Sequence, residues 1–259
     1  MWFFGPKSVR LYAKQAKHLA DKGIKLVLLQ NSQIEFQIGR LAGFPCYLIN
    51  QNIHVNEHVF QPRPAAKEYD AIYTSAAARY KRIHLGLGIR RLFVLTYFWP
   101  DKRDASGKWN LELFDPRLRN VAHNREKLEP QEIAPLLNTA GCGLALSLVE
   151  GAMYASMEYL LCGLPVVTTR NVGGRDFFLN SSNSVHVRAT RAAVASAVAD
   201  VSCRTAGGDE IREAVLNKVV QLRWDLAGIV SSYTARKDVA SLSESWWAAP
   251  SGIAARRLF

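Results

Sequence analysis

Several features that define whole classes of protein are missing from this sequence of 259 residues. No stretch approaches the roughly 18 to 20 consecutive apolar residues that a membrane-spanning helix needs. The opening Met-Trp-Phe-Phe is too short for the apolar core of a signal peptide. The sequence also has no internal repeat, no low-complexity tract and no helix-turn-helix, zinc-finger or aromatic-basic RNA-binding pattern. We therefore expect a soluble, cytoplasmic protein.

Cysteine is scarce and scattered. The four cysteines include no Cys-x-x-Cys pair, and three of them lie in or beside apolar segments; they are Cys46, Cys142, Cys162 and Cys203. This pattern is typical of reduced thiols that pack in a core, because a disulfide framework or a zinc site needs closely spaced pairs.

Basic residues, in contrast, are in excess. There are 33 Lys and Arg against 22 Asp and Glu, which gives a formal net charge of +11. Such an excess attracts phosphate groups, anionic lipid headgroups or nucleic acid. Because no nucleic-acid-binding pattern accompanies the charge, a phosphate-bearing ligand and an anionic membrane surface are the favoured partners, and nucleic acid is disfavoured. A basic face that is merely solvated is the alternative.

Alternating strand and helix patterns predict an α/β fold, with a Rossmann-like parallel sheet and helices on both faces. Only two of the predicted strands fall within the first fifty residues, and residues 99–120 are predicted to be a loop or short insertion. The predicted strands are residues 24–29, 47–49, 71–73, 92–97, 143–147, 165–168 and 185–187. The predicted helices are residues 7–22, 33–42, 79–87, 130–138, 153–162, 190–200 and 209–232.

Two glutamates, Glu150 and Glu158, bracket the start of the helix predicted over residues 153–162. Their separation spans roughly 12 Å on a helix and turns about 80° past two full turns, so the carboxylates cannot share one metal ion or one proton. They can instead hold two ends of an elongated polyhydroxylated ligand. The peptide N–H groups of residues 151–154 would lie at the amino-terminal end of the helix, beside the two glutamates, where the helix dipole favours an anion. Sugar, ribose and phosphate suit this arrangement.

The region around these glutamates resembles the retaining GT-B glycosyltransferases of the group 1 type (family 4). The signature of that family is Glu-x7-Glu, a small-Gly-x-Pro-Val-Val strand and a Gly-Gly loop. The matching elements here are Glu150 to Glu158, residues 162–167 (CGLPVV) and residues 173–176 (GGRD). The resemblance covers roughly residues 50–230 and begins at residues 52–62, which are similar to the family's interdomain segment.

The resemblance implies three parts of the chain. Residues 1–62 would be a remnant of the amino-terminal domain with the interdomain segment, residues 63–232 the Rossmann-like domain that binds a nucleotide-sugar donor, and residues 233–259 a crossover helix and tail. The pair Trp246-Trp247 would dock on the amino-terminal domain or, alternatively, lie at a membrane interface. Two strands are too few for a full amino-terminal domain, so we expect a portion of a longer protein or a reduced form.

The implied activity is transfer of a hexose from a nucleoside diphosphate sugar to a glycan or a lipid-linked acceptor. The resemblance assigns Glu150 to the donor sugar and Glu158 to the ribose. Fixed cations must balance the charge of the leaving diphosphate, since the sequence has no Asp-x-Asp metal pair. The resemblance assigns this role to Lys81. No metal, no cofactor and no covalent intermediate are expected, and the protein would lie in the cytoplasm or at the inner face of the membrane.

Two positions depart from the family pattern. Ala76 stands where the family has an arginine, so Arg79 and Arg82 are the substitutes that could reach the donor diphosphate. Met153 replaces a glycine, and its bulk near the bound sugar would change the choice of donor or spoil the site. The donor-binding backbone that the resemblance implies is formed by Gly151, Ala152, Met153, Tyr154, Gly173 and Gly174. The two loop glycines alternatively serve only the geometry of the turn.

Two other functions remain open. A non-catalytic nucleotide-sugar binding module or partner subunit is favoured by Ala76 and Met153. A basic Rossmann-like protein that binds nucleic acid or membranes would explain the charge but leave the paired glutamates without a role. A dehydrogenase is disfavoured, because residues 86–91 (GLGIRR) lack the third glycine of a dinucleotide-binding loop and follow no predicted strand.

Overall fold

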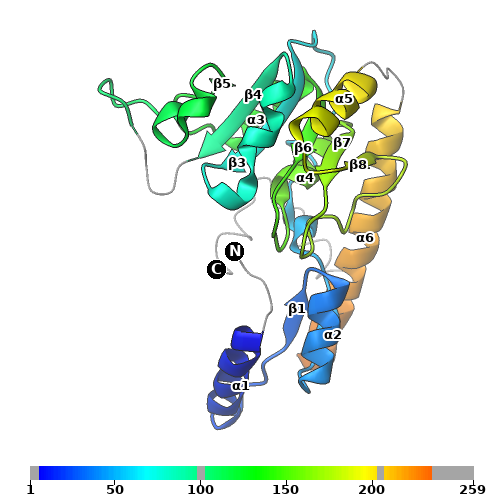
Figure 1. Ribbon diagram of the computed structural model, residues 1–259. Coiled ribbons are helices and arrows are strands. Elements are labelled where there is room, and N and C mark those ends of the chain that lie inside the picture. The colour runs from blue at the N-terminus through cyan, green and yellow to red at the C-terminus, as the bar shows by residue number, and fades with distance from the viewer. Residues whose placement is uncertain (1–5, 98–102, 203–206, 235–259) are drawn as a thin grey trace.

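The computed structural model describes residues 6–97, 103–202 and 207–234 and contains two parallel sheets of unequal size. The larger sheet has the strand order β5-β4-β3-β6-β7-β8, and the smaller one pairs β1 with β2. Figure 1 shows the smaller sheet with α1 and α2 below the larger one, while α6 runs alongside both. The strands are β1 (Leu28–Gln30), β2 (Cys46–Leu48), β3 (Tyr69–Ala76), β4 (Leu92–Tyr97), β5 (Ala122–His123), β6 (Ala140–Ala145), β7 (Val166–Thr169) and β8 (Ser184–Val187).

The α-helices mostly follow the predicted ranges. They are α1 (Pro6–Ala20), α2 (Gln33–Leu41), α3 (Pro130–Asn138), α4 (Tyr154–Leu161), α5 (Arg191–Ser202) and α6 (Gly208–Tyr233). Short 3₁₀ segments connect them: η1 (Gln51–His54), η2 (Arg79–Lys81), η3 (Ile83–Gly88), η4 (Leu111–Leu113) and η5 (Pro116–Leu118).

The strands of the larger sheet are nearly continuous apolar runs, as expected for parallel strands that are covered on both faces. β7 is buried throughout, and in β4 only Tyr97 is exposed. Helices flank this sheet: α5 packs with η3 against β3 and β6, and α4 packs with α6 and against β6 and β7 (Figure 1). The prediction of a Rossmann-like α/β fold is confirmed.

Residues 79–87 do not form the predicted basic helix, and this prediction was wrong. They form η2 and η3, separated by Arg82, whose φ of 54° is left-handed. A left-handed residue cannot continue a right-handed helix. Arg82 is held in this conformation because its guanidinium donates to Leu146 O at 2.6 Å and to Thr169 Oγ1 at 2.7 Å, at the ends of β6 and β7.

The stretch after β4 is more structured than the predicted loop. Its described part contains η4 and η5, and the side chains of Leu111 and Leu118 are fully buried in the main core. The edge strand β5 follows and pairs with Phe93 and Val94 of β4. The prediction missed this strand, because two residues are too few to show a hydrophobic period.

The smaller sheet has its own apolar cluster. Leu28, Phe44 and Cys46 form its buried centre, and partly buried side chains of α1 and α2 pack around them. The register of the parallel pair aligns Leu28 with Cys46. The two predicted strands of the first fifty residues are therefore present, although β1 begins four residues later than predicted, at Leu28 rather than Ile24.

The long helix α6 joins the two sheets. Its Arg223 guanidinium donates to Ile53 O at 2.9 Å and pairs with Glu57 at 2.5 Å, while Tyr233 Oη lies 3.1 Å from Tyr47 Oη of β2. The helix thereby fixes residues 51–57, which connect the sheets. Within residues 6–97, 103–202 and 207–234 we find no helix with the length and apolarity that a membrane crossing requires. The predicted tail with Trp246-Trp247 lies outside the described residues.

Candidate active site at the carboxyl edge of the larger sheet

Most of the predicted site residues lie on loops that follow three neighbouring strands, whereas Tyr154 and Glu158 lie in α4. β3 leads into residues 77–82, β6 into residues 146–153 and β7 into residues 170–176. Because all three strands are parallel and adjacent, their carboxyl ends meet at one edge of the sheet. In open α/β sheets ligands bind at this edge, where the strand order reverses. Here the reversal lies between β3 and β6.

An ion pair between Lys81 and Glu150 lies at this edge. Lys81 Nζ is 2.6 Å from Glu150 Oε2, and the two side chains are only 4% and 12% exposed. The two residues are 69 positions apart in the sequence, and Lys81 was predicted to lie in a helix over residues 79–87; the fold brings them together. Burial of both groups strengthens their attraction, since little water screens it. The pair places a cation and a carboxylate side by side, as a charged sugar-phosphate ligand would require.

Glu158 is the second predicted carboxylate and has a different environment. It lies in α4, and its Oε2 is buried without a hydrogen-bond partner among the described residues, although part of the residue remains accessible. Burial raises the pKa of this carboxyl to about 7. A buried acceptor without a donor costs about 1 to 3 kcal/mol. Glu158 is therefore ready to accept hydrogen bonds from a ligand.

The raised pKa of Glu158 predicts a pH-dependent stability. The group binds its proton more tightly in the folded chain than in the unfolded one, so its contribution to stability is lost as pH rises from about 4.5 towards 7. Relative to wild type, the variant Glu158→Gln should gain about 2 to 3 kcal/mol between pH 4.5 and pH 8. Urea unfolding at several pH values measures this gain. The control Glu213→Gln, at an exposed carboxylate of α6, should show no such trend.

Tyr97 belongs to the same site, and the sequence analysis missed it. Its ring lies at the exposed end of β4, and burial of the hydroxyl followed by the charges of Glu150, Tyr80 and Glu158 raises its pKa to about 12. The phenol therefore lies within electrostatic reach of both carboxylates. The sequence feature that could have indicated this residue is a tyrosine at the end of an apolar strand, because the carboxyl ends of the strands line the site.

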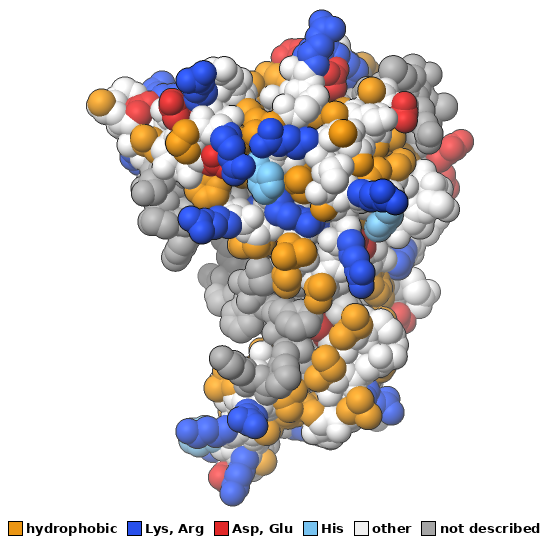
Figure 2. Space-filling model, viewed as in Figure 1, with side chains coloured by type: hydrophobic (Ala, Val, Ile, Leu, Met, Phe, Trp, Pro, Cys, Tyr) orange, Lys and Arg blue, Asp and Glu red, His pale blue; other side chains and the backbone are white. Residues whose placement is uncertain are grey.

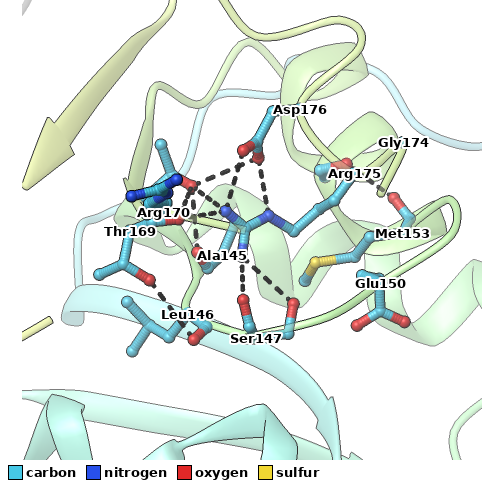
Figure 3. A network of polar contacts seen from close by, with 12 residues as sticks. Ala145, Leu146, Ser147, Glu150, Met153, Thr169, Arg170, Gly174, Arg175 and Asp176 are labelled. Atoms are coloured by element: carbon cyan, nitrogen blue, oxygen red, sulfur yellow. Dashed lines mark hydrogen bonds and ion pairs between the residues drawn. The ribbon is translucent and has the colours of Figure 1, made fainter. Parts of the chain in front are cut away.

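Arg175 organises the loops beneath the carboxylates, as Figure 3 shows. Its side chain is fully buried, and its Nη1 donates to Ser147 O at 2.6 Å. The Nη2 group donates to Thr168 Oγ1 at 2.7 Å, and Nε donates to Asp176 Oδ1 at the same distance. One guanidinium thus ties the loop after β6 to the end of β7. The sequence analysis quoted Arg175 within the Gly-Gly motif but gave it no role.

Gly173 and Gly174 permit close packing of two loops. Gly173 has a φ of 121°, and a Cβ there would overlap the carbonyl oxygen of Glu150. A Cβ on Gly174 would overlap the carbonyl oxygens of Asn31 and Gly151. Glycine is therefore required at both positions by the backbone itself. The loop lies beside Glu150, and its two glycines allow the backbone of residues 150–151 to pack directly against it.

The two arginines that the sequence offered as substitutes for Ala76 have different surroundings. Arg82 is engaged by oxygens at the ends of β6 and β7, so it has a structural task. Arg79 is exposed and lines a separate pocket between η2 and η5. Ala76 itself is buried at the end of β3. Contact of Arg79 or Arg82 with a donor diphosphate stays a prediction.

The entrance to α4 carries the remaining predicted residues. Met153 is 3% exposed, and its carbonyl accepts a hydrogen bond from Asn52 Nδ2 at 3.2 Å, whereas Tyr154 is exposed. Figure 3 shows the Met153 side chain between Arg175 and Glu150. The peptide N–H groups of residues 151–154 donate to no acceptor among the described residues. They are free to bind an anion.

Other buried polar atoms near these loops also lack partners. They are Asn52 Oδ1, Thr74 Oγ1 and both terminal atoms of the Asn171 side chain, within the part of the chain that the structure describes. Asn171 lies two residues after the end of β7, and Asn52 lies in η1. Buried polar atoms are nearly always hydrogen-bonded in folded proteins, so unsatisfied ones mark places where a ligand or water binds. We find no cluster of three or more His, Cys, Asp or Glu that could hold a metal in the described ranges.

Comparison with known proteins gives a likeness of fold. The sequence matches no protein-family model and no curated protein. Its structure is similar to that of Anabaena Alr3699/HepE in complex with UDP and glucose, with 13% identity and a TM-score of 0.65 over 88% of this chain and 68% of that chain. It is also similar to sucrose-phosphate synthase from Thermosynechococcus elongatus, with 16% identity and a TM-score of 0.62 over 89% of this chain and 63% of that chain.

A third similar structure is a glycosyltransferase from Rickettsia africae, with 16% identity and a TM-score of 0.57 over 87% of this chain and 67% of that chain. The chain spans about two thirds of the length of each of these three proteins. All three share the arrangement of a parallel α/β sheet flanked by helices. The described residues therefore have the α/β fold of the GT-B glycosyltransferases, with a pair of buried charges at the carboxyl edge of the larger sheet.

Proposed function

We propose that this chain is the donor-binding portion of a retaining glycosyltransferase, which transfers a hexose from a nucleoside diphosphate sugar to a glycan or lipid-linked acceptor. The observation that carries the proposal is the group formed by Lys81, Glu150 and Glu158 at the carboxyl edge of a GT-B-like sheet. One cation, one paired carboxylate and one unpartnered carboxylate match the phosphate, the sugar and the ribose of such a donor.

Each charged group has a proposed role in binding. Glu158 accepts hydrogen bonds from the ribose hydroxyls, because its buried Oε2 lacks a donor in the free protein. Glu150 accepts a hydrogen bond from a hydroxyl of the hexose while it holds Lys81 in place. The free N–H groups of residues 151–154 bind the diphosphate oxygens at the start of α4. A donor would therefore lie across the ends of β3 and β6.

The proposed chemistry is electrostatic. As the bond between the hexose and the diphosphate breaks, negative charge grows on the leaving oxygen, and Lys81, which Glu150 holds in place, is the cation that would stabilise it. Such preorganised charge is usually the largest part of a catalytic effect. The leaving phosphate then accepts the proton of the acceptor hydroxyl on the same face of the sugar. No protein nucleophile is needed for retention in this scheme.

A second candidate function is nucleotide-sugar binding without turnover. Two observations favour it: Ala76 is buried where the resemblance expects an arginine, and Met153 is buried where the resemblance expects a glycine. Fewer cations would leave the diphosphate less stabilised. This candidate shares the donor site but not the transfer step.

Release of the nucleoside diphosphate distinguishes the two functions. The purified chain is incubated with UDP-, GDP- and ADP-hexoses that carry a radiolabelled sugar, with water or added glycans as acceptors. Release of one nucleotide that falls at least 100-fold in Lys81→Met supports the transferase. Tight donor binding without release supports the binding module. If neither binding nor release is seen with any donor, both candidates are wrong.

A further inference from the structure

A pocket that lies outside the candidate donor site borders the same segment, η2. It has a volume of about 410 Å³, and it is lined by Ala78, Arg79, Ile83 and His84 on one side and by residues 114–117 on the other. Neither Glu150, Glu158 nor Lys81 lines it. Figure 2 shows Lys and Arg side chains gathered around a His on the part of the surface that covers the larger sheet.

Two arginines of this pocket can bind an anion. Arg79 is exposed, and its guanidinium has no hydrogen bond or ion pair within the described ranges. Arg117 is fixed by Asp115 through its Nε at 2.9 Å and its Nη2 at 2.7 Å, which leaves Nη1 for another acceptor. Asp115 removes one unit of charge but holds the guanidinium in one orientation. A held guanidinium loses less entropy when it binds a phosphate oxygen.

The surroundings of His84 show that the positive charges dominate this pocket. Burial lowers the pKa of the imidazole, and the charges of Arg117 and Arg191 lower it further. Arg82 adds to this effect, and only Asp115 opposes it. The imidazole is therefore neutral near pH 7. An anion in the pocket would offset the arginines and bring the His84 pKa back up.

Apolar side chains complete the lining. Ile83 is buried and Phe114 is half-buried, and both border the same cavity as the arginines. A bare inorganic ion would leave these surfaces without contacts. Arginines beside apolar side chains suit a ligand in which a phosphate group is joined to a sugar ring or to another group with apolar surface.

We propose that this pocket binds a phosphate-bearing ligand through Arg79, Arg117 and His84, with the body of the ligand against Ile83 and Phe114. Arg79 and Lys81 both belong to η2, so the pocket and the candidate donor site share one short element. The pocket is placed to hold the phosphate of the acceptor while the donor lies across the ends of β3 and β6. Only this assignment to the acceptor rests on the proposed function.

Nuclear magnetic resonance of the His84 side chain tests the proposal. The resonance is assigned by its absence from the spectrum of His84→Gln. Sodium phosphate or hexose 1-phosphate is then added at constant ionic strength, and sodium chloride at the same ionic strength is the control. We expect saturable shifts with both ligands, tighter binding of hexose 1-phosphate, and a rise in the pKa of His84. The double variant Arg79→Gln/Arg117→Gln should weaken binding at least tenfold, whereas Arg119→Gln, an exposed arginine in the same segment, should not.

Two further arms identify the source of the phosphate and separate this site from the donor site. Vesicles of phosphatidylcholine that contain phosphatidic acid show whether a lipid headgroup binds to the same arginines. Glu158→Ala should leave the His84 shifts intact even if the proposed function fails. The proposal is overturned if neither soluble phosphate nor vesicles bind, or if binding survives the double variant.

Discussion

Replacing Arg175 with methionine should lower the free energy of unfolding by about 3 to 5 kcal/mol. The guanidinium is fully buried, and its removal would leave Ser147 O, the Thr168 hydroxyl and Asp176 without their donor. Buried acceptors that lose a donor carry the full cost of their desolvation. Urea unfolding followed by circular dichroism measures the loss.

Arg91→Met is the matched control for this prediction. Arg91 also pairs with an aspartate, Asp70, at 2.6 Å, but its side chain is 47% exposed. Exposed ion pairs are worth about 0 to 1 kcal/mol, so the control should stay close to wild type. If both variants lose the same free energy of unfolding, the buried hydrogen bonds of Arg175 do not stabilise the fold more than an exposed ion pair does, and the prediction is wrong.

Replacing Lys81 with methionine should lower stability by about 3 kcal/mol and abolish donor turnover. The change removes the cation but leaves the Glu150 carboxylate buried, with no other side-chain partner among the described residues. A buried charge without a counter-charge is among the costliest defects in a folded protein. Thermal unfolding and nucleotide release measure the two effects.

The double variant Lys81→Met/Glu150→Gln separates stability from function. Since glutamine carries no charge, the double variant should recover most of the lost stability, which makes the coupling energy of the pair measurable. It should not recover turnover, because the cation for the diphosphate is still missing. A double variant as unstable as the single one would mean that the pair does not account for the loss.

The sequence was sufficient to predict which elements carry the two glutamates of the site. Glu150 follows a buried strand and Glu158 lies within the next helix, and both positions come directly from the hydrophobic pattern. Parallel strands of one sheet necessarily place their carboxyl ends together. The ion pair of Lys81 with Glu150 at 2.6 Å was not predicted, because Lys81 was expected to lie in a helix over residues 79–87.

The features that the sequence could not predict depend on contacts between distant segments. Arg82 becomes left-handed because its guanidinium reaches the ends of β6 and β7, and no local pattern encodes that reach. Arg175 resembles any surface arginine in the sequence, yet it is fully buried. The pocket proposed to bind phosphate joins Arg79, Ile83 and His84 to a stretch predicted as a loop, so its two halves could not be paired beforehand.

Calorimetric titration of wild type and Glu158→Ala with UDP, GDP and ADP, free and joined to their hexoses, tests the central claim most directly. We predict that one nucleotide binds selectively and that its affinity falls at least tenfold, about 1.4 kcal/mol, in the variant. Glu213→Ala, at an exposed carboxylate of α6, should bind as wild type does. A nucleotide that binds wild type and Glu158→Ala with equal affinity would contradict the claim that this edge of the sheet is a donor site.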